Sequence, residues 1–242
     1  DTAENVAAKY QISTAEQHDV VLRRHAQYND ALADDHAFQR RYMTLPFDIP
    51  DGRFRKTVGS LTTDEGVANA TAEGLAKLKP VRPNGTITFG GQTHPADGTV
   101  GLLVTTEEKA RQCAKDPSIR IRVLGFGQSR TEKGYMPQAP VEAAQRALDD
   151  ADLGIGDMDA VKSHNPFAVN DIVFSRETGF DLGAMNNFGC SLIWGHPQGP
   201  TGLRTIVELI EELALKGGGR GLFQGCAAGD SAMSVVLDVS SR

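Results

Sequence analysis

Hydrophobic and polar residues in the first part of the chain follow the period of a helix. The pattern predicts helical structure from Thr2 to about Arg41. Within it, Ser13 to Glu16 forms a capping box that opens an amphipathic helix running to Ala33. The sequence therefore begins with a long helical region that presents one apolar side.

The pattern then becomes irregular. Pro46 to Thr63 mixes proline, glycine and isolated apolar residues, which is typical of short strands and loop at a surface. A helix is predicted from Ala70 to Leu78, because Pro80 stops it. Ile87 to Gly101 is rich in glycine and threonine and predicts a tight loop, and a charged helix follows from Glu107 to Ala114.

Beyond Asp116 short apolar runs alternate with helical periods. The predicted strands are Ile119–Val123, Met158–Val161, Gly221–Gln224 and Met233–Val239, and the predicted helices are Pro140–Asp150, Phe167–Thr178 and Thr201–Lys216. Strands separated by helices of this length predict βαβ units, and the last two strands form a closing hairpin. The fold class is α/β, with a mixed sheet layered with helices. The best boundary lies near residues 115–118, which divides the chain into 1–115 and 116–242.

Composition narrows the class of protein. The chain has 242 residues, 40% of them hydrophobic, and a formal charge of -6 without a long basic stretch, so a nucleic-acid partner is not expected. No apolar run approaches the roughly 20 residues of a membrane span. The three cysteines are odd in number and lack the spacing of a zinc site, so neither a disulfide framework nor a metal site is expected. A reducing compartment is favoured: the cytoplasm is expected, and an organellar matrix is left open.

Reactive side chains gather in three short segments where strands end or loops turn: Ser163–Phe167, Trp194–Gly202 and Gly225–Gly229. Taken singly, each has an ordinary structural explanation, such as a histidine in a turn or a small buried cysteine. In an open α/β sheet, however, ligands bind beyond the strand ends, so the three segments are expected to converge on one pocket.

The order of these segments resembles the thiolase family. A strand-end motif with Asn or His, a Gly-His-Pro turn before a long helix, and a Cys-x-Gly loop before the last hairpin occur here in that order. Upstream segments also fall in family order: residues 2–6, 12–19, 75–80, 85–88, 97–98 and 107–110. The resemblance covers nearly the whole chain and implies a thiolase-like fold, in which residues 1–115 are the loop region and the end of an N-terminal domain.

The resemblance also implies roles for individual residues. His196 would activate cysteines and hold a thioester oxygen, Cys226 would move the α-proton, and His164 would help build an oxyanion site. Ala228 and Gly229 would offer a backbone N–H to the acyl oxygen, although the family usually has glycine at the position of Ala228. A cysteine beside a histidine is expected to have a lowered pKa.

Coenzyme A is implied as a substrate, and no tightly bound cofactor is expected. By resemblance, Thr93, His94, Asn165 and Phe167 would contact CoA or the acyl group, with His94 replacing a small residue. Phe188 and Trp194 depart from the family's run of small residues and are expected to pack. His18, His25 and His36 are expected to be solvated, Cys190 to be buried, and Cys113 to lie on a surface helix.

No segment resembles the site of the cysteine that accepts the acyl group in this family. The expectation is therefore a C-terminal portion that needs an N-terminal half, as a second chain or a missing segment, within a homodimer or tetramer. The reaction implied is reversible thiolytic cleavage of 3-ketoacyl-CoA or Claisen condensation of acyl-CoAs.

Two other functions remain open on the sequence. One is a decarboxylating ketosynthase-like enzyme, which uses a cysteine and two histidines on the same fold but needs no second cysteine to remove a proton. The other is a non-catalytic CoA- or lipid-binding subunit that kept the fold and lost the nucleophile.

Overall fold

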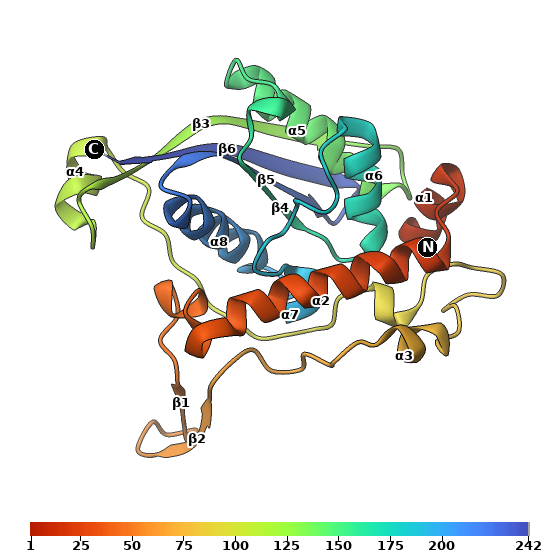
Figure 1. Cartoon of the computed structure of the whole chain (residues 1–242), viewed down its shortest axis with the longest axis horizontal. Coiled ribbons are helices and arrows are strands. Elements are labelled where there is room, and N and C mark those ends of the chain that lie inside the picture. The colour runs from red at the N-terminus through yellow and green to blue at the C-terminus, as the bar shows by residue number, and fades with distance from the viewer. Residues whose placement is uncertain (242) are drawn as a thin grey trace.

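A four-stranded mixed sheet organises the second half of the chain. The computed structural model describes residues 1–241, and its sheet has the strand order β3-β6-β5-β4 (Figure 1). The strands are β3 (Ile119–Arg130), β4 (Ala160–His164), β5 (Gly219–Ala227) and β6 (Ser231–Ser241). β6 runs antiparallel to β3 and β5, whereas β4 and β5 are parallel. This confirms the predicted mixed α/β architecture.

Helices cover both faces of this sheet. On one face lie α5 (Ala139–Asp150) and α6 (Ala168–Thr178), whose Ala144 and Phe174 pack against Val161 and Leu222. On the other lies α8 (Thr201–Leu215), packed on Phe223 and the neighbouring strands. Because side chains alternate along a strand, residues next to each other in β4 or β5 face different helices.

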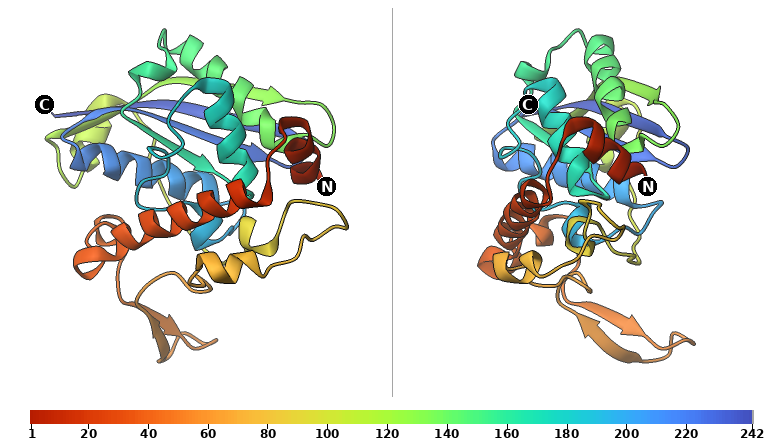
Figure 2. Two further views of the ribbon diagram at one scale, coloured as in Figure 1. Left: turned by 45° about the vertical axis from the view of Figure 1, so that its right-hand side comes forward. Right: turned by 90° about the vertical axis from the view of Figure 1, so that its right-hand side faces the viewer.

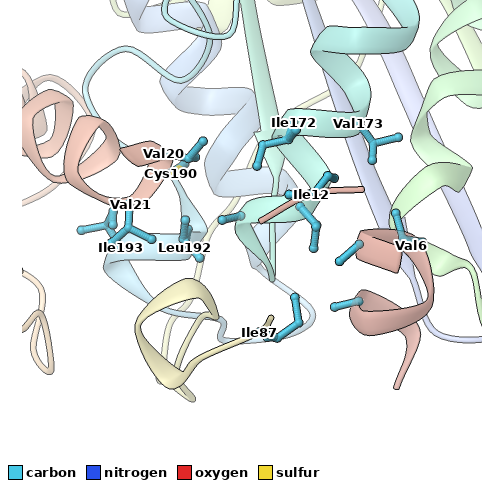
Figure 3. Close-up of a cluster of buried hydrophobic side chains, with 14 of the residues drawn as sticks. Val6, Ile12, Val20, Val21, Ile87, Ile172, Val173, Cys190, Leu192 and Ile193 are labelled. Carbon is cyan, nitrogen blue, oxygen red and sulfur yellow. The ribbon is translucent and has the colours of Figure 1, made fainter. Parts of the chain in front are cut away.

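The N-terminal helices pack against the edge of this layered unit. α1 (Thr2–Tyr10) and α2 (Thr14–His36) share an apolar cluster with α6 and the short α7 (Ser191–Trp194) (Figure 3). Ser13 caps α2 by accepting a hydrogen bond from the Glu16 N–H, as predicted. Residues 33–35 leave helical geometry, so the regular part of α2 ends where the sequence predicted.

The middle segment contains a hairpin and several short helices. A two-stranded hairpin, β1 (Phe47–Pro50) with β2 (Thr57–Leu61), projects from the body of the molecule (Figure 2). Short helices α3 (Ala72–Ala76) and α4 (Glu107–Cys113) follow, and the 3-10 turns are η1 (Gln39–Arg41), η2 (Phe89–Gly91), η3 (Met136–Gln138) and η4 (Ile155–Asp157). Within residues 1–241, every helix is too short or too polar to cross a bilayer.

All four strands of the sheet differ from their predicted bounds: β5 and β6 are longer at both ends, and β3 and β4 differ in ways that affect the site. β3 continues past Val123 to Arg130, through Gly125 and Gly127, because these glycines let the backbone of α5 approach closely. β4 begins and ends later than the predicted Met158–Val161, so that His164 becomes its last residue. The polar residues Lys162 and Ser163 lie inside this strand, fully buried.

Candidate active site

The imidazole rings of His164 and His196 are stacked. Their centroids are 4.4 Å apart and their planes are inclined by 26°. His164 ends β4, and His196 lies in the loop between α7 and α8, where its backbone N–H donates to the carbonyl oxygen of His94 at 2.8 Å. The strand end and the Gly-His-Pro turn, distant in sequence, thus meet at the carboxyl edge of the parallel strands.

Both imidazoles are held in the neutral form. Burial, with a smaller contribution from His196, lowers the pKa of His164 to about 3. Burial also lowers the pKa of His196. At neutral pH each ring can therefore donate one proton and accept one, which is what proton transfer and oxygen stabilisation require.

The turn that carries His196 is fixed from both sides. Nδ1 of His196 lies 2.8 Å from Oγ1 of Thr201, the first residue of α8. Gly195 has φ of 98°, and a Cβ there would lie 2.8 Å from the Cβ of Ala96. Only glycine fits this backbone and this space, which explains the glycine before His196.

Arg204, in the first turn of α8, supports the segment that carries His196. Its guanidinium lies 4.0 Å from the ring centroid of Trp194 and donates to both carboxylate oxygens of Asp64, at 2.5 and 2.8 Å. Asp64 also accepts hydrogen bonds from Tyr28 and Gln39. The middle segment is thereby tied to the segment that contains His196.

Trp194 and Phe188 are packing residues, as the sequence predicted. Trp194 is buried, and Phe188 stacks on Phe38 with ring centroids 4.1 Å apart. Nearby, the buried ammonium of Lys162 lies 3.9 Å from Glu208 and 3.8 Å from Glu212, and it donates to the carbonyl oxygen of Asn187.

Cys226 lies on the neighbouring strand β5, and its side chain points to the face of the sheet opposite to His164. Gly225 pairs with His164 in the parallel ladder, which puts the Cα atoms of Cys226 and His164 roughly 6 Å apart. The sulfur is directed towards α6, where Nδ2 of Asn170 donates to it at 3.4 Å. A ligand lying off the strand ends can touch both groups, whereas a ligand on one face of the sheet cannot.

Cys226 is 7% exposed, and burial raises the pKa of its thiol to about 12. The expectation of a lowered pKa was wrong for this chain. Within residues 1–241 the sulfur has the neutral amide of Asn170 as its hydrogen-bond partner, not an imidazolium, so desolvation decides the direction.

Ala228 and Gly229 form the exposed turn between β5 and β6. Gly229 has φ of 82°, and the hydroxyl of Ser231 donates to the carbonyl oxygen of Ala228 at 3.2 Å. These residues follow Cys226 directly, so their backbone N–H groups lie near the strand end that carries the thiol.

A cavity of about 610 Å³ lies between α2 and the segments 66–95, and neither His164 nor His196 belongs to its lining. Thr93 and His94 belong to its lining, and both connect it to the reactive groups. Oγ1 of Thr93 donates to the backbone oxygen of Ser191 at 2.5 Å, and the hydroxyl of Ser191 lies 2.8 Å from Nδ1 of His164. The other lining residues are Val21, His25, Gly66, Ala68, Asn69, Ala70, Thr71, Gly74, Leu75, Leu78, Phe89, Gly90, Gln92, Pro95, Leu192 and Ile193.

His25 was not foreseen as part of this cavity. The helical pattern placed it on a solvated face, yet it is half-buried, and burial lowers its pKa. The expectation of a solvated His25 was wrong because the cavity wall is built by segments 66–95, which fold back over α2. A helical period alone contains no sign of that cover.

Asn165 and Phe167, which were expected to contact CoA or the acyl group, do not belong to the lining of this cavity. Asn165 is fully buried. Its Nδ2 donates to Asp171, and its Oδ1 accepts the N–H of Leu192 and lies 3.2 Å from Oγ of Ser191. Phe167 packs against the apolar cluster of α1, α2 and α6. Ser191 and Asn170, which hold His164 and Cys226, were missed by the sequence argument because neither belongs to a recognisable motif.

The remaining cysteines are placed as expected. Cys190 is buried, and burial beside Asp171 raises its pKa to about 11. Cys113 is exposed on α4. Within residues 1–241, histidine, cysteine and acidic side chains form no group of three that could hold a metal ion.

Two family models match this chain. Residues 118–239 match the C-terminal domain of thiolase, and residues 1–108 match the thiolase N-terminal domain. The chain belongs to the thiolase family.

Curated relatives of known name belong to the same family. The chain is 30% identical to an acetyl-CoA acetyltransferase of Pseudomonas aeruginosa over 98% of this chain and 59% of that protein. It is 29% identical to the human mitochondrial trifunctional enzyme subunit beta, over 98% of this chain and 52% of the relative. The chain thus spans little more than half the length of these relatives.

The structural matches are close. The Bacillus anthracis acetyl-CoA acetyltransferase superposes with a TM-score of 0.88 at 30% identity, over 99% of this chain and 59% of that structure. Human mitochondrial 3-ketoacyl-CoA thiolase in complex with CoA gives a TM-score of 0.83 at 26% identity, over 100% of this chain and 58% of that one. The thiolase-like fold predicted from the sequence is confirmed.

Proposed function

We propose that this chain supplies the proton-transfer and oxyanion groups of an acyl-CoA:acetyl-CoA C-acyltransferase. The observation that carries the proposal is the stacked pair of neutral imidazoles at the strand ends, with the Cys226 thiol on the next strand. Relatives named acetyl-CoA acetyltransferase and 3-ketoacyl-CoA thiolase support the reaction class.

In the cleavage direction a nucleophilic cysteine thiolate attacks the keto carbon of 3-ketoacyl-CoA. The bond between the α- and β-carbons breaks, and its electron pair stays on the α-carbon as the enolate of acetyl-CoA. The Cys226 thiol, protonated at neutral pH, donates its proton there. His164 and His196 donate to the enolate oxygen, because a neutral imidazole carries one N–H.

The cycle closes when the sulfur of free CoA attacks the acyl-cysteine thioester. The thiol proton of CoA passes by way of His196 and replaces the one given up by Cys226. The products are a shortened acyl-CoA and the regenerated cysteine. Run backwards, the same groups catalyse Claisen condensation.

The cavity beside Thr93 and His94 takes the pantetheine arm of CoA in this proposal. Its volume of about 610 Å³ lies in the range of ligand sites, and its lining mixes apolar residues with a few polar groups. A structural relative solved with CoA supports the choice of ligand. CoA acts as a substrate, and no tightly bound cofactor enters the mechanism.

The acyl-accepting cysteine is proposed to lie outside these 242 residues, on an N-terminal half. Cys190 is sealed in the core and Cys113 lies exposed on α4, so neither suits the role. The complete enzyme is proposed to be a dimer or tetramer in a reducing compartment, consistent with exposed apolar residues such as Leu103 and Val104 and with three free cysteines.

The test is an assay of the complete enzyme with acetoacetyl-CoA and CoA, following loss of the enolate absorbance. Cys226→Ser should still form the acyl-enzyme, seen by mass spectrometry, while turnover falls by several orders of magnitude. His196→Ala should impair both steps, and Cys113→Ser should change neither. Normal turnover of Cys226→Ser would refute the mechanism, and activity of the isolated chain would refute an external nucleophile.

A decarboxylating condensing enzyme is the second candidate, because two histidines beside an external cysteine would also serve that chemistry. It predicts release of CO₂ from malonyl-CoA and tolerance of Cys226→Ser. Release of CO₂ without cleavage of acetoacetyl-CoA would favour it.

A further inference from the structure

We propose that Ser191 is a positioning residue that fixes neutral His164 in the tautomer with its proton on Nε2. This inference rests on the proposed function, because it explains how His164 presents a donor to the substrate oxygen. It concerns a serine that none of the recognised motifs contains.

Ser191 lies directly behind His164. Its side chain is fully buried at the start of α7, and its Oγ is 2.8 Å from Nδ1 of His164. Within residues 1–241 the His164 ring makes its hydrogen bond through Nδ1. Nε2 has no protein partner there and is not one of the unpaired polar atoms that are buried. Nδ1 therefore faces the protein interior and Nε2 faces the ligand side.

The direction of the hydrogen bond follows from the amide of Asn165. Its Nδ2 donates at 2.7 Å to Asp171, which can only accept because it is ion-paired with buried Arg24. Oδ1 of Asn165 must then face the other way, where it accepts the N–H of Leu192 at 3.1 Å.

The hydroxyl of Ser191 has one proton to place. Its oxygen already accepts the backbone N–H of Asn165 at 3.1 Å. The proton can go to Nδ1 of His164 at 2.8 Å or to Oδ1 of Asn165 at 3.2 Å, where it would be a second donor beside the N–H of Leu192. The contact with Nδ1 is the shorter of the two, and Oδ1 already has a donor in Leu192, so Ser191 donates and Nδ1 accepts.

This arrangement determines what His164 offers to a ligand. When Nδ1 accepts a hydrogen bond, the single proton of the neutral ring must be on Nε2, which becomes a donor. The opposite tautomer would present a lone pair to the substrate oxygen and repel it. An asparagine at the position of His164 would need no such control, because an amide always carries N–H groups.

The direct test is ¹⁵N NMR of ring-labelled histidine in the complete enzyme, with His164 assigned by its disappearance in His164→Asn. The expected spectrum at neutral pH shows a protonated Nε2 and an unprotonated Nδ1. In Ser191→Ala both nitrogens should move towards averaged shifts. A protonated Nδ1 in the parent enzyme would overturn the inference, whether or not the enzyme cleaves 3-ketoacyl-CoA.

Kinetics give an independent test. Ser191→Ala should lower kcat by about 10-fold or more with little change in KM, but by less than the ~10²–10³ lost when an oxyanion donor is removed. Ser234→Ala is the matched control, since Ser234 is also fully buried and its hydroxyl has no partner within residues 1–241. The control should keep its kcat.

The decisive comparison is the double variant. In a His164→Asn background, Ser191→Ala should cost no further kcat, because no tautomer remains to be set. An equal loss in both backgrounds would assign Ser191 a purely structural role and refute the inference. A complete lack of thiolase activity in the parent enzyme would instead refute the proposed function and leave the NMR result standing.

Discussion

The guanidinium of Arg204 lies over the ring of Trp194, 4.0 Å from its centroid, while two of its nitrogens donate to the carboxylate of Asp64. Arg204 also donates to Glu208 at 3.0 Å, so one cation satisfies two acids and one aromatic face. Since Trp194 comes two residues before His196, the position of the reactive imidazole depends on a contact with the middle segment of the chain.

Arg204→Met is therefore expected to destabilise the protein strongly. It leaves Asp64 without its cation and leaves Glu208 with the more distant Lys162, 3.9 Å away. The side chains of Arg204 and Asp64 are 14% and 13% exposed, so the loss should lie between the roughly 1 kcal/mol of an exposed ion pair and the ~3–5 kcal/mol of a fully buried one. Chemical unfolding of the variant measures the loss. Arg146→Met is the control, because Arg146 pairs with Glu142 while both side chains are more than half exposed; it should cost less than about 1 kcal/mol. Equal losses of unfolding free energy would show that the Arg204 network stabilises the protein no more than an exposed ion pair does.

Gly195→Ala tests the backbone of the Gly-His-Pro turn. The added Cβ meets Ala96 and His94 at 2.8–2.9 Å in a conformation that alanine rarely adopts. A shift of His196 by about 1 Å would lower kcat about 100-fold. Gly156→Ala has no neighbour within 4 Å and should be neutral. Full activity of Gly195→Ala would mean that the turn is more pliable than its packing indicates.

His164 makes stability sensitive to acid. Its pKa is about 3 in the folded chain, below the ordinary 6.5, so between these values the unfolded chain binds the extra proton. The stabilisation is complete above pH 6.5 and is lost as pH falls through this window, by up to about 1.4 kcal/mol per pH unit.

His164→Asn should flatten this acid limb in unfolding curves measured between pH 7 and about 4. His36→Asn is the matched control, because His36 lies at the end of α2 with φ of 61°, a conformation that asparagine tolerates. The control should keep the acid limb. An unchanged limb in His164→Asn would show that His164 titrates normally.

The three cysteines should differ widely in alkylation. Cys113 is exposed, whereas burial raises the pKa of Cys226 to about 12 and that of Cys190 to about 11. Iodoacetamide at pH 8 should modify Cys113 first and the other two at least ~100-fold more slowly, because the thiolate is the reactive form. Peptide mapping by mass spectrometry measures the rates. Rapid labelling of Cys226 would indicate an open, acidic thiol.

The sequence predicted helices better than strands. The period of residues 13–33 identified α2, and the apolar face of residues 201–216 identified α8. The predicted strand stopped at Val123, where the alternation of apolar and polar residues ends, whereas β3 continues through Gly125 and Gly127, which make room for Ala143 and Ala147 of α5. A close approach between two elements leaves no trace in the local pattern.

The site was predicted in part. The convergence of His164 and His196 followed from strand ends and a turn motif. Three features of the site were not predicted: the contact of Cys226 with Asn170, the cover over His25, and the contact of Ser191 with His164. Each joins segments 27 or more residues apart, and at least one partner lies outside any motif. Such contacts depend on tertiary packing, which a period or a spacing cannot encode.

Lys162 has a consequence for how β4 aligns with its neighbour. A slip of one residue would turn its ammonium from Glu208 and Glu212 into the apolar cluster beneath α5 and α6, and would rotate His164 away from His196. Stranding a charge in that cluster is far costlier than misplacing an aliphatic side chain. The buried lysine thus fixes the register of the strand. Because Lys162 lies two residues before His164, its ion pairs also fix the position of His164 beside His196.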